Sequence, residues 1–184
     1  MQARLLSEVH GDTFGLPPLI PLVRSGDTTN VEARAAKRYW RALFGDDFRR
    51  DVDANNQNRF LNYGYAILRA ATARAVCAAG LHPSLGLHHH NKYNAWCLAD
   101  DVMEPFRPVV DHTVFHLVKN KGADCDFNQA VRAELIRSVM SRVFILNQQR
   151  TVMDALNLVS TSLVDAMSGS DATLSLPQEF ARAA

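Results

Sequence analysis

Residues 60–79 read FLNYGYAILRAATARAVCAA, and the helical spacing of their apolar and aromatic side chains is the strongest structural signal in the chain. Gly80 follows at the point where a helix would end. Several small residues in this stretch would let neighbouring helices approach closely; they are Gly64, Ala66, Ala70, Ala71, Ala73 and Ala75. We therefore predict a central buried helix that begins after the capping residues Asn55 and Asn56.

Helices are also predicted before this segment and at the end of the chain. Thr28-Thr29-Asn30 offers capping side chains for a helix that carries Glu32 in its first turn and stops at Gly45. Two amphipathic helices are expected at about Asn128–Leu146 and Thr151–Met167. No strand pattern is evident, so the predicted class is all-α, a multi-helix lobe.

A further helical region follows the central helix. Asn91 or Asn94 would cap a helix, which Pro105 and Pro108 should kink or restart and which then continues to about Lys119. The two ends of the chain look different, because glycines and prolines are frequent before residue 26 and Ser168-Gly169-Ser170 ends the last helix. We expect residues 1–25 to be a linker remnant, 26–170 a helical catalytic domain and 171–184 a flexible tail.

Length and composition fit a single domain, because 184 residues with 47% hydrophobic residues can bury one core. No segment is apolar enough to cross a bilayer, and the first residues do not resemble a secretory signal. The three cysteines are far apart and form no CxxC pair, which argues against a disulfide framework or a cysteine zinc site. We expect a cytoplasmic protein that does not bind membranes.

The net charge of +1 is mild evidence against a protein that binds DNA through its global field. The charges are nevertheless uneven, since the span from Asn30 to Gly80 holds nine basic and five acidic residues. Taken alone, this local excess is more typical of a solvated helix face than of a binding surface.

The acids Asp101 and Glu104 are three residues apart, so a helix would place both carboxylates on one face. A hard divalent cation would relieve their repulsion, and an imidazole from the run His88-His89-His90 could complete a site for Mg²⁺ or Mn²⁺. Each signal has an ordinary alternative. Acid pairs are common on solvated faces, and three histidines also occur in surface loops, cloning scars and zinc-binding tracts. Spacing alone therefore leaves the function open.

Three ordered blocks carry a family resemblance. They are GDTTNVEARAAKRYWRALFG (Gly26–Gly45), NRFLNYGYAILRA (Asn58–Ala70) and AGLHPSLGLHHHNKYNAWCLADDVMEPFRPVVD (Ala79–Asp111). Together they resemble the CRISPR-associated integrase that captures new spacers, the first-numbered protein of those systems. The variants HHNKYN and MEPFRPVVD look like the type II subfamily, which accompanies single-protein RNA-guided effector nucleases.

The resemblance implies an all-helical catalytic lobe with Glu32, His89 and Glu104 as ligands of Mg²⁺ or Mn²⁺ and as the catalytic residues. His89 is chosen over its neighbours because it is the third residue after Gly86, as in the family's G-x-x-H segment. Asp101 matches the first acid of the family's D-x-x-[DE] segment and is an expected accessory. Support roles fall to Asn62 and Tyr65, on the helix that lines the family's site.

The resemblance also implies a reaction and its partners. The 3′-hydroxyl of a short DNA fragment would attack a phosphodiester at the edge of a CRISPR repeat, with Lys37, Arg38 and Arg41 contacting phosphates. The expected partners are double-stranded DNA with free 3′ ends, CRISPR repeat DNA, a second copy of the chain, a small ferredoxin-like adaptation protein and the RNA-guided effector nuclease. Since a protonated imidazole cannot bind a metal, activity should fall as the pH drops toward the histidine pKa of about 6.5.

The sequence departs from the family at one point. The family carries a smaller β-rich domain, which helps to form the dimer, ahead of the catalytic lobe, whereas only a short segment precedes Gly26 here. The chain therefore reads as a truncated, fragmentary or split member. Two alternatives stay open: a metal-dependent DNase that uses water instead of a 3′-hydroxyl, and a non-catalytic helical interaction domain.

Overall fold

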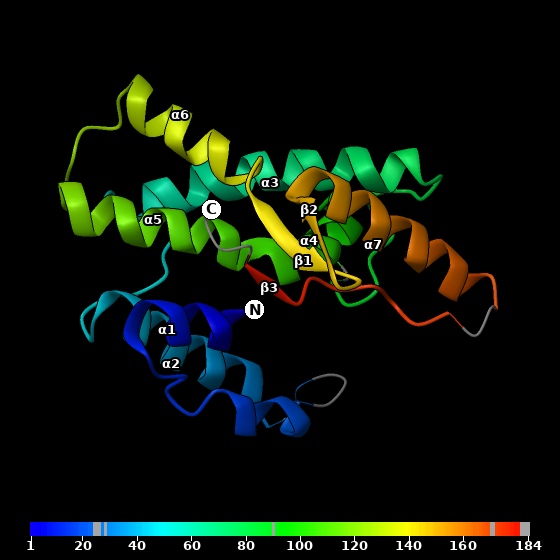
Figure 1. The fold of residues 1–184 in the computed structure, drawn as a ribbon, viewed down its shortest axis with the longest axis horizontal. Coiled ribbons are helices and arrows are strands. Elements are labelled where there is room, and N and C mark those ends of the chain that lie inside the picture. Colours follow the sequence, from blue (N-terminus) through cyan, green and yellow to red (C-terminus); the bar gives the residue numbers. More distant parts are fainter. Residues whose placement is uncertain (24–26, 28, 90, 170–171, 181–184) are drawn as a thin grey trace.

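The helix α3 (Asn58–Ala78) confirms the predicted central helix and packs against four other helices of the computed structural model (Figure 1). The structure describes residues 1–23, 27, 29–89, 91–169 and 172–180. The other helices are α1 (Gln2–His10), η1 (Pro17–Leu22), α2 (Val31–Phe44), α4 (Cys97–Met103), η2 (Glu104–Phe106), α5 (Arg107–Lys121), α6 (Gln129–Ser138) and α7 (Val152–Met167). Three short strands, β1 (Arg142–Ile145), β2 (Gln148–Thr151) and β3 (Glu179–Phe180), form one antiparallel sheet in the order β2-β1-β3.

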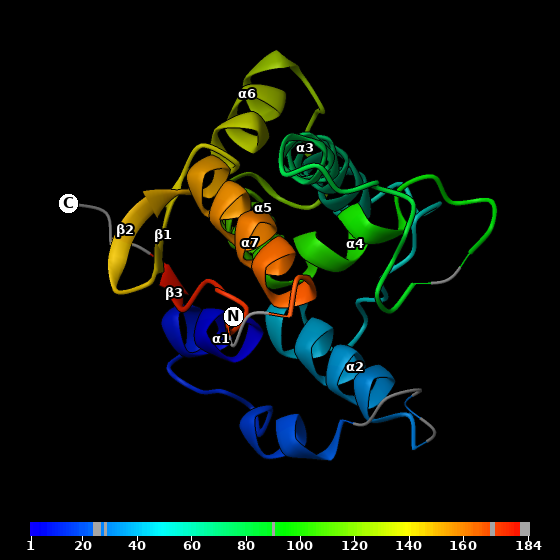
Figure 2. The same cartoon turned by 90° about the vertical axis from the view of Figure 1, so that its right-hand side faces the viewer.

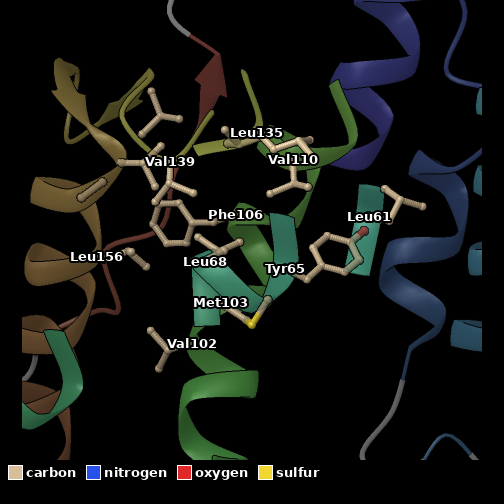
Figure 3. Packing of buried hydrophobic residues seen from close by; sticks show 14 of the residues in the cluster. Leu61, Tyr65, Leu68, Val102, Met103, Phe106, Val110, Leu135, Val139 and Leu156 are labelled. Atoms are coloured by element: carbon tan, nitrogen blue, oxygen red, sulfur yellow. The ribbon is translucent and has the colours of Figure 1, made fainter. Parts of the chain in front are cut away.

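The main core surrounds α3, where Phe60, Leu61 and Leu68 are completely buried against residues of α4, α5, α6 and α7 (Figure 3). The close approach expected from small residues occurs at Gly64, because a Cβ atom there would lie 2.4 Å from Val110 Cγ1 of α5. The expectation does not hold for every small residue of α3, since Ala66 and Ala70 are exposed.

A second, smaller core lies between α1, η1 and α2, which form a layer beside the rest of the molecule (Figure 2). Its buried residues are Leu5, Leu6, Leu16, Tyr39 and Leu43. The segment expected to be a linker therefore contains a helix that packs. The glycines and prolines do break the chain, but α1 ends before most of them, at Gly11, whose φ of 74° allows its N–H to bond to Ser7 O.

Most of the predicted helices are confirmed, including the stop of α2 at Gly45, the break at Pro105 and the start of α7 behind Thr151. The capping of α2 differs from the prediction. The Asp27 carboxylate accepts hydrogen bonds from Val31 N (2.7 Å) and Glu32 N (3.0 Å), whereas Asn30 makes no side-chain cap. Thr28 lies outside the described residues, as do Gly26, His90, Ser170 and the end of the tail.

The predicted helix over Asn128–Leu146 is wrong in its second half. The helix α6 ends at Ser138, and β1 and β2 form a hairpin that the sequence did not indicate. Leu146 and Asn147 connect the strands with φ angles of 51° and 60°, values typical of a two-residue hairpin turn. Close to the end of the chain, Phe180 of β3 pairs with Val143 of β1. Within the described residues, no helix combines the length and the apolar character that crossing a membrane requires.

Candidate metal centre

A cavity of about 900 Å³ lies where the α1–α2 layer faces α4, η2 and the start of α5. Its wall includes five ligand-type side chains, which come from three separate segments of the chain: Glu32, His88, His89, Asp101 and Glu104. The lining also includes apolar side chains before α2, namely Leu16, Leu19, Ile20 and Val23. The three residues expected to bind a metal therefore share one cavity, although 57 and 15 residues separate Glu32 from His89 and His89 from Glu104.

Asp101 holds the histidine loop in place. Its carboxylate accepts hydrogen bonds from the backbone N–H groups of Leu87 (2.6 Å), His88 (2.9 Å) and His89 (3.2 Å). Burial alone would raise the pKa of Asp101, but these bonds and the one from the His89 ring together lower it below its usual value. Asp101 is thus a fixed anion beneath the loop.

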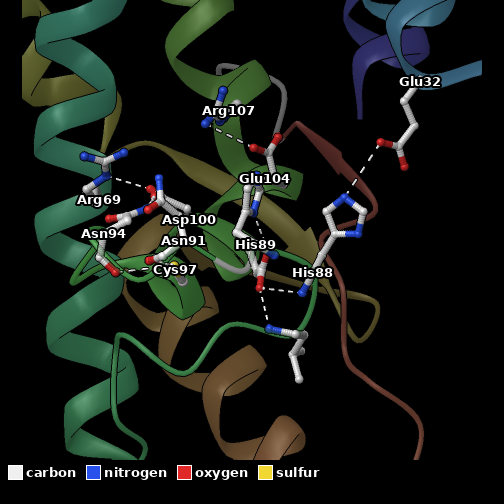
Figure 4. A network of polar contacts seen from close by, with 12 residues as sticks. Glu32, Arg69, His88, His89, Asn91, Asn94, Cys97, Asp100, Glu104 and Arg107 are labelled. Carbon is white, nitrogen blue, oxygen red and sulfur yellow. Dashed lines mark hydrogen bonds and ion pairs between the residues drawn. The ribbon is translucent and has the colours of Figure 1, made fainter. Parts of the chain in front are cut away.

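His89 is oriented by the same carboxylate. Its Nδ1 bonds to Asp101 Oδ1, an arrangement that favours, for a neutral ring, the tautomer with the proton on Nδ1 and the Nε2 lone pair free for a ligand. Metal-binding histidines commonly have such a carboxylate behind the ring, because it fixes the tautomer and the ring orientation. In Figure 4, His89 lies next to Glu104.

Gly86 lets the loop pass this close to Asp101. A Cβ atom at this position would lie 2.2 Å from His89 O, 2.8 Å from Cys97 Cβ and 3.1 Å from Asp101 Oδ2. Any side chain would push the backbone of His89 away from its anchor. The spacing between Gly86 and His89 therefore has a steric cause.

Glu104 has a raised pKa although it forms an ion pair. Arg107 Nη2 lies 3.0 Å from Glu104 Oε1, and 45% of the Glu104 side chain is exposed, yet its pKa is raised because the surrounding cavity wall removes water from the carboxylate. Arg107 and His89 act to lower this pKa, whereas Asp100 and Asp101 raise it further. A divalent cation would satisfy this carboxylate.

Glu32 lies across the cavity from Glu104, on the first turn of α2 (Figure 4). The Nε2 atom of His88 lies 3.9 Å from Glu32 Oε2. The structure thus brings His89 and Glu104 together and leaves Glu32 facing them, with His88 between. Among the residues that the structure describes, no three histidine, cysteine or acidic side chains are already close enough to enclose an ion.

A buried cluster behind the cavity was not evident from the sequence. Asp111 of α5 is 1% exposed and accepts hydrogen bonds from Tyr39 of α2 (2.6 Å) and Tyr65 of α3. Burial raises the pKa of Asp111 to about 7, although the two tyrosine hydroxyls and Arg107 act in the opposite direction. Burial and the neighbouring Asp111 also raise the pKa of Tyr39 and of Tyr65 well above the usual value.

Arg107 connects this cluster to the cavity, because its guanidinium lies 4.9 Å from the centre of the Tyr65 ring and bonds to Glu104. Its position three residues after Glu104 is a sequence signal that could have identified it. Tyr65 itself does not line the cavity. Asn62 lies elsewhere: it accepts a hydrogen bond from Arg50 Nη2 (2.6 Å) and donates one to Val52 O (2.8 Å).

The three basic residues expected to contact DNA lie on α2 outside the cavity wall. Lys37 and Arg38 are exposed, and Arg38 donates a hydrogen bond to Gly15 O (3.0 Å). Arg41 is half-buried. On the other side of the site, the buried Asp100 binds Arg69 Nε of α3 (2.6 Å) and Asn94 Nδ2 (2.8 Å), which fixes α4 and the preceding loop to α3 (Figure 4).

Comparison of the sequence with known protein families and curated proteins identifies a family to which the chain is similar. The model of the family described as "CRISPR associated protein Cas1" matches residues 24–149. A "CRISPR-associated endonuclease Cas1" from Neisseria meningitidis serogroup C (strain 8013) is 40% identical over 157 residues, which cover 85% of this chain and 51% of that protein. A "CRISPR-associated endonuclease Cas1 2" from Pyrobaculum aerophilum is 36% identical over 101 residues, 53% of this chain and 34% of that one. The chain thus spans about half the length of the curated relatives it matches, or less.

Two solved structures share the fold. A CAS1 protein from Thermotoga maritima matches with a TM-score of 0.75 at 15% identity, over 92% of this chain and 63% of that chain. A structure described as "Casposase bound to integration product" matches with a TM-score of 0.71 at 20% identity, over 91% of this chain and 56% of that chain.

Proposed function

The chain belongs to the Cas1 family of CRISPR-associated proteins, and from this premise we propose that it carries the metal-dependent DNA endonuclease and integrase site of that family. One observation carries the proposal: Glu32, His89 and Glu104, from three distant segments, line a single cavity. The comparison proteins support this proposal, since the Neisseria relative is named an endonuclease and the casposase structure holds an integration product.

The donor atoms in the cavity suit Mg²⁺ or Mn²⁺, which accept carboxylate oxygens and, for Mn²⁺, an imidazole nitrogen. Glu32 and Glu104 would supply the negative charge and His89 Nε2 the neutral ligand. Asp101 supports this assignment by holding His89 Nδ1, and Arg107 supports it by holding the Glu104 carboxylate at the cavity. When bound, the ion would polarise a phosphodiester and favour ionisation of the attacking hydroxyl.

The proposed reaction is a transesterification on DNA. The 3′-oxygen of a short fragment forms a new bond to phosphorus at the edge of a CRISPR repeat, and the bond from that phosphorus to the repeat's own 3′-oxygen breaks. The attacking hydroxyl loses a proton and the leaving oxygen gains one. On the protein side, Arg107 holds Glu104 and Asp101 orients His89.

The basic residues of α2 would position the DNA. Lys37 and Arg38 are exposed on the helix that also carries Glu32, so contacts to phosphates there would place the backbone near the cavity. The same proposal includes double-stranded DNA with free 3′ ends, CRISPR repeat DNA, a second copy of the chain, a small ferredoxin-like adaptation protein and an RNA-guided effector nuclease as partners.

A strand-transfer assay tests the proposal. A labelled short duplex and a plasmid with a CRISPR repeat are incubated with the protein and Mn²⁺, and joined products are separated from cleaved ones. We expect joined product with the unmodified chain and at least about a hundredfold less with Glu104→Ala, since loss of transition-state charge stabilisation has effects of this size.

Glu134→Ala is a matched control, because it removes an acid that pairs with Lys121 outside the cavity. Its activity should equal that of the unmodified chain. Cleaved DNA without any joined product would mean that the site acts as a nuclease and not as an integrase. Equal activity of Glu104→Ala and Glu134→Ala would refute the proposed site.

A further inference from the structure

Two histidines outside the cavity face each other on α5. His112 and His116 are one helical turn apart, and their Nε2 atoms are 3.2 Å from each other. The helix α1 packs against α5 at this point and brings Glu8 to the pair, with Glu8 Oε1 3.6 Å from His112 Nε2 (Figure 1). None of these three side chains lines the cavity that holds Glu32, His89 and Glu104.

We propose that His112 and His116 chelate a divalent transition-metal ion, with Zn²⁺ as the best fit, and that Glu8 is the third protein ligand. Tetrahedral zinc with Zn–N bonds of about 2.0–2.1 Å holds two coordinating nitrogens roughly 3.3 Å apart. The observed 3.2 Å between the two Nε2 atoms already matches this separation.

Glu8 needs a small movement to complete the site. Its carboxylate lies within reach of His112 but makes no described contact with His116, so three ligands do not yet converge on one point. Zinc binding would need the Glu8 oxygen to move from 3.6 Å to roughly 3.3 Å from His112 Nε2 and to approach His116 as well. Glu8 is half exposed and lies in the last turn of α1, so its side chain has room for this adjustment.

The surroundings favour metal binding by the two rings. The ring of Phe180 stacks on His112 with centroids 5.6 Å apart, which restricts the orientation of the imidazole. Imidazole and carboxylate ligands together suit zinc better than they suit Mg²⁺ or Ca²⁺.

Zinc at this position would tie α1 to α5 and so join the small α1–α2 core to the main core. The inference does not depend on the proposed DNA chemistry, because the two sites share no residue. Zinc should raise the midpoint of thermal unfolding by about 5 °C at a hundredfold excess over its dissociation constant.

Zinc titration by calorimetry tests the inference. The titration uses the full chain with His89→Ala and Glu104→Ala, which removes two ligands of the proposed catalytic ion. We expect one equivalent of Zn²⁺ to bind and the affinity to fall at least about tenfold when His116→Ala is added. His82→Ala is the matched control, because His82 is an exposed histidine that belongs to neither site.

Electron paramagnetic resonance with Cu²⁺ gives a second measurement that does not depend on stability. The spectrum should show coupling to two nitrogens in the parent and to one after His116→Ala, with circular dichroism used to check that each variant is folded. The inference is overturned if Zn²⁺ does not bind, if His116→Ala leaves the affinity within tenfold, or if His82→Ala weakens binding equally. The 3.2 Å contact would then be only a hydrogen bond between the two imidazole rings.

Discussion

Gly86 is the residue with the tightest surroundings in the site, and its role is steric. The loop backbone folds back on itself here, with His89 O, Cys97 Cβ and Asp101 Oδ2 all within 3.1 Å of where a Cβ atom would be. Because His89 O belongs to the backbone, no side-chain rotation can relieve the contact. The single hydrogen in place of a side chain therefore allows Asp101 to hold the histidine loop.

Replacing Gly86 by alanine should destabilise the protein by about 1–3 kcal/mol, as overpacking typically does, and should displace His89. We expect strand transfer to fall much more than the stability change alone would explain. Chemical denaturation and the strand-transfer assay measure the two effects. Leu85→Ala is the control, since Leu85 is 72% exposed and should change neither quantity. Normal activity of Gly86→Ala would show that the loop tolerates a shift.

Replacing Asp101 by asparagine tests the orientation of His89. The variant keeps the shape of the side chain but loses the charge that fixes the Nδ1–H tautomer. Mn²⁺ affinity should fall about 10–100-fold, the usual result of losing a carboxylate behind a metal-binding histidine. Calorimetric titration with Mn²⁺ measures this, with the exposed Asp53→Asn as control. Unchanged Mn²⁺ affinity would mean that His89 does not need Asp101.

Part of this site could be predicted from the sequence. The i, i+3 spacing indicated Asp101 and Glu104, and the same rule applied to Arg107 would have added the partner of Glu104. Glu32 and His89 were assigned only through family resemblance, and their roles as ligands stay predictions. No pattern could have connected Asp111 with Tyr39, 72 residues away, because such a contact depends on how the helices pack.

At the level of elements, the crossing of α3 and α5 depends on Gly64. The absent side chain leaves room for Val110, whose Cγ1 would otherwise be 2.4 Å from a Cβ atom. Both residues are buried, so neither helix can move into solvent to relieve a clash.

Gly64→Ala should therefore destabilise the protein by about 1–3 kcal/mol despite the better helix propensity of alanine. The double variant Gly64→Ala/Val110→Ala should regain part of this loss, because the clashing methyl group is gone. Urea denaturation of both single variants and the double variant gives the coupling energy, expected to be at least about 0.5 kcal/mol for residues in contact. Strictly additive effects would mean that the helices separate without strain.

Helix periodicity located α2, α3, α5 and α7, since each buries one face along most of its length. It failed after Ser138. The hairpin turn places Leu146 and Asn147 at positive φ, and leucine rarely adopts this conformation, so the sequence carries no turn signal. The strands β1 and β2 are four residues each, too short to show alternation.

For the whole molecule, the buried triad of Asp111, Tyr39 and Tyr65 connects the two cores, because Tyr39 belongs to the α1–α2 core and Tyr65 to the main one. The triad makes stability depend on pH. The folded-state pKa of Asp111 is about 7, whereas an unfolded aspartate has a pKa near 3.9. Between these values the unfolded chain ionises and the folded one does not.

The contribution of Asp111 to the free energy of unfolding should therefore be highest below pH 4 and should fall as the pH rises to 7. The contribution is at most about 4 kcal/mol over this window. The Asp111→Asn variant cannot ionise at this position. The unfolding free energy of the unmodified chain, relative to that of Asp111→Asn, should therefore fall as the pH rises from 4 to 7. Denaturant titrations at several pH values measure it. A constant difference would indicate that Asp111 ionises normally in the folded protein.

The arrangement of the two cores was beyond sequence reasoning. Residues 1–25 were expected to be a linker remnant, yet α1 and η1 cover α2 and form part of the cavity wall. Short helices of this kind gain most of their stability from packing, which local patterns do not report.

The split of the ligands between two layers has a thermodynamic consequence. Glu32 is attached to the α1–α2 layer, whereas His89 and Glu104 are attached to the main body. If a cation binds all three residues, its affinity depends on the distance between the two layers. By the same linkage, cation binding favours the layer spacing at which all three ligands reach the ion. Anything that presses the layers together would tighten ion binding, and anything that wedges them apart would release the ion by the same factor.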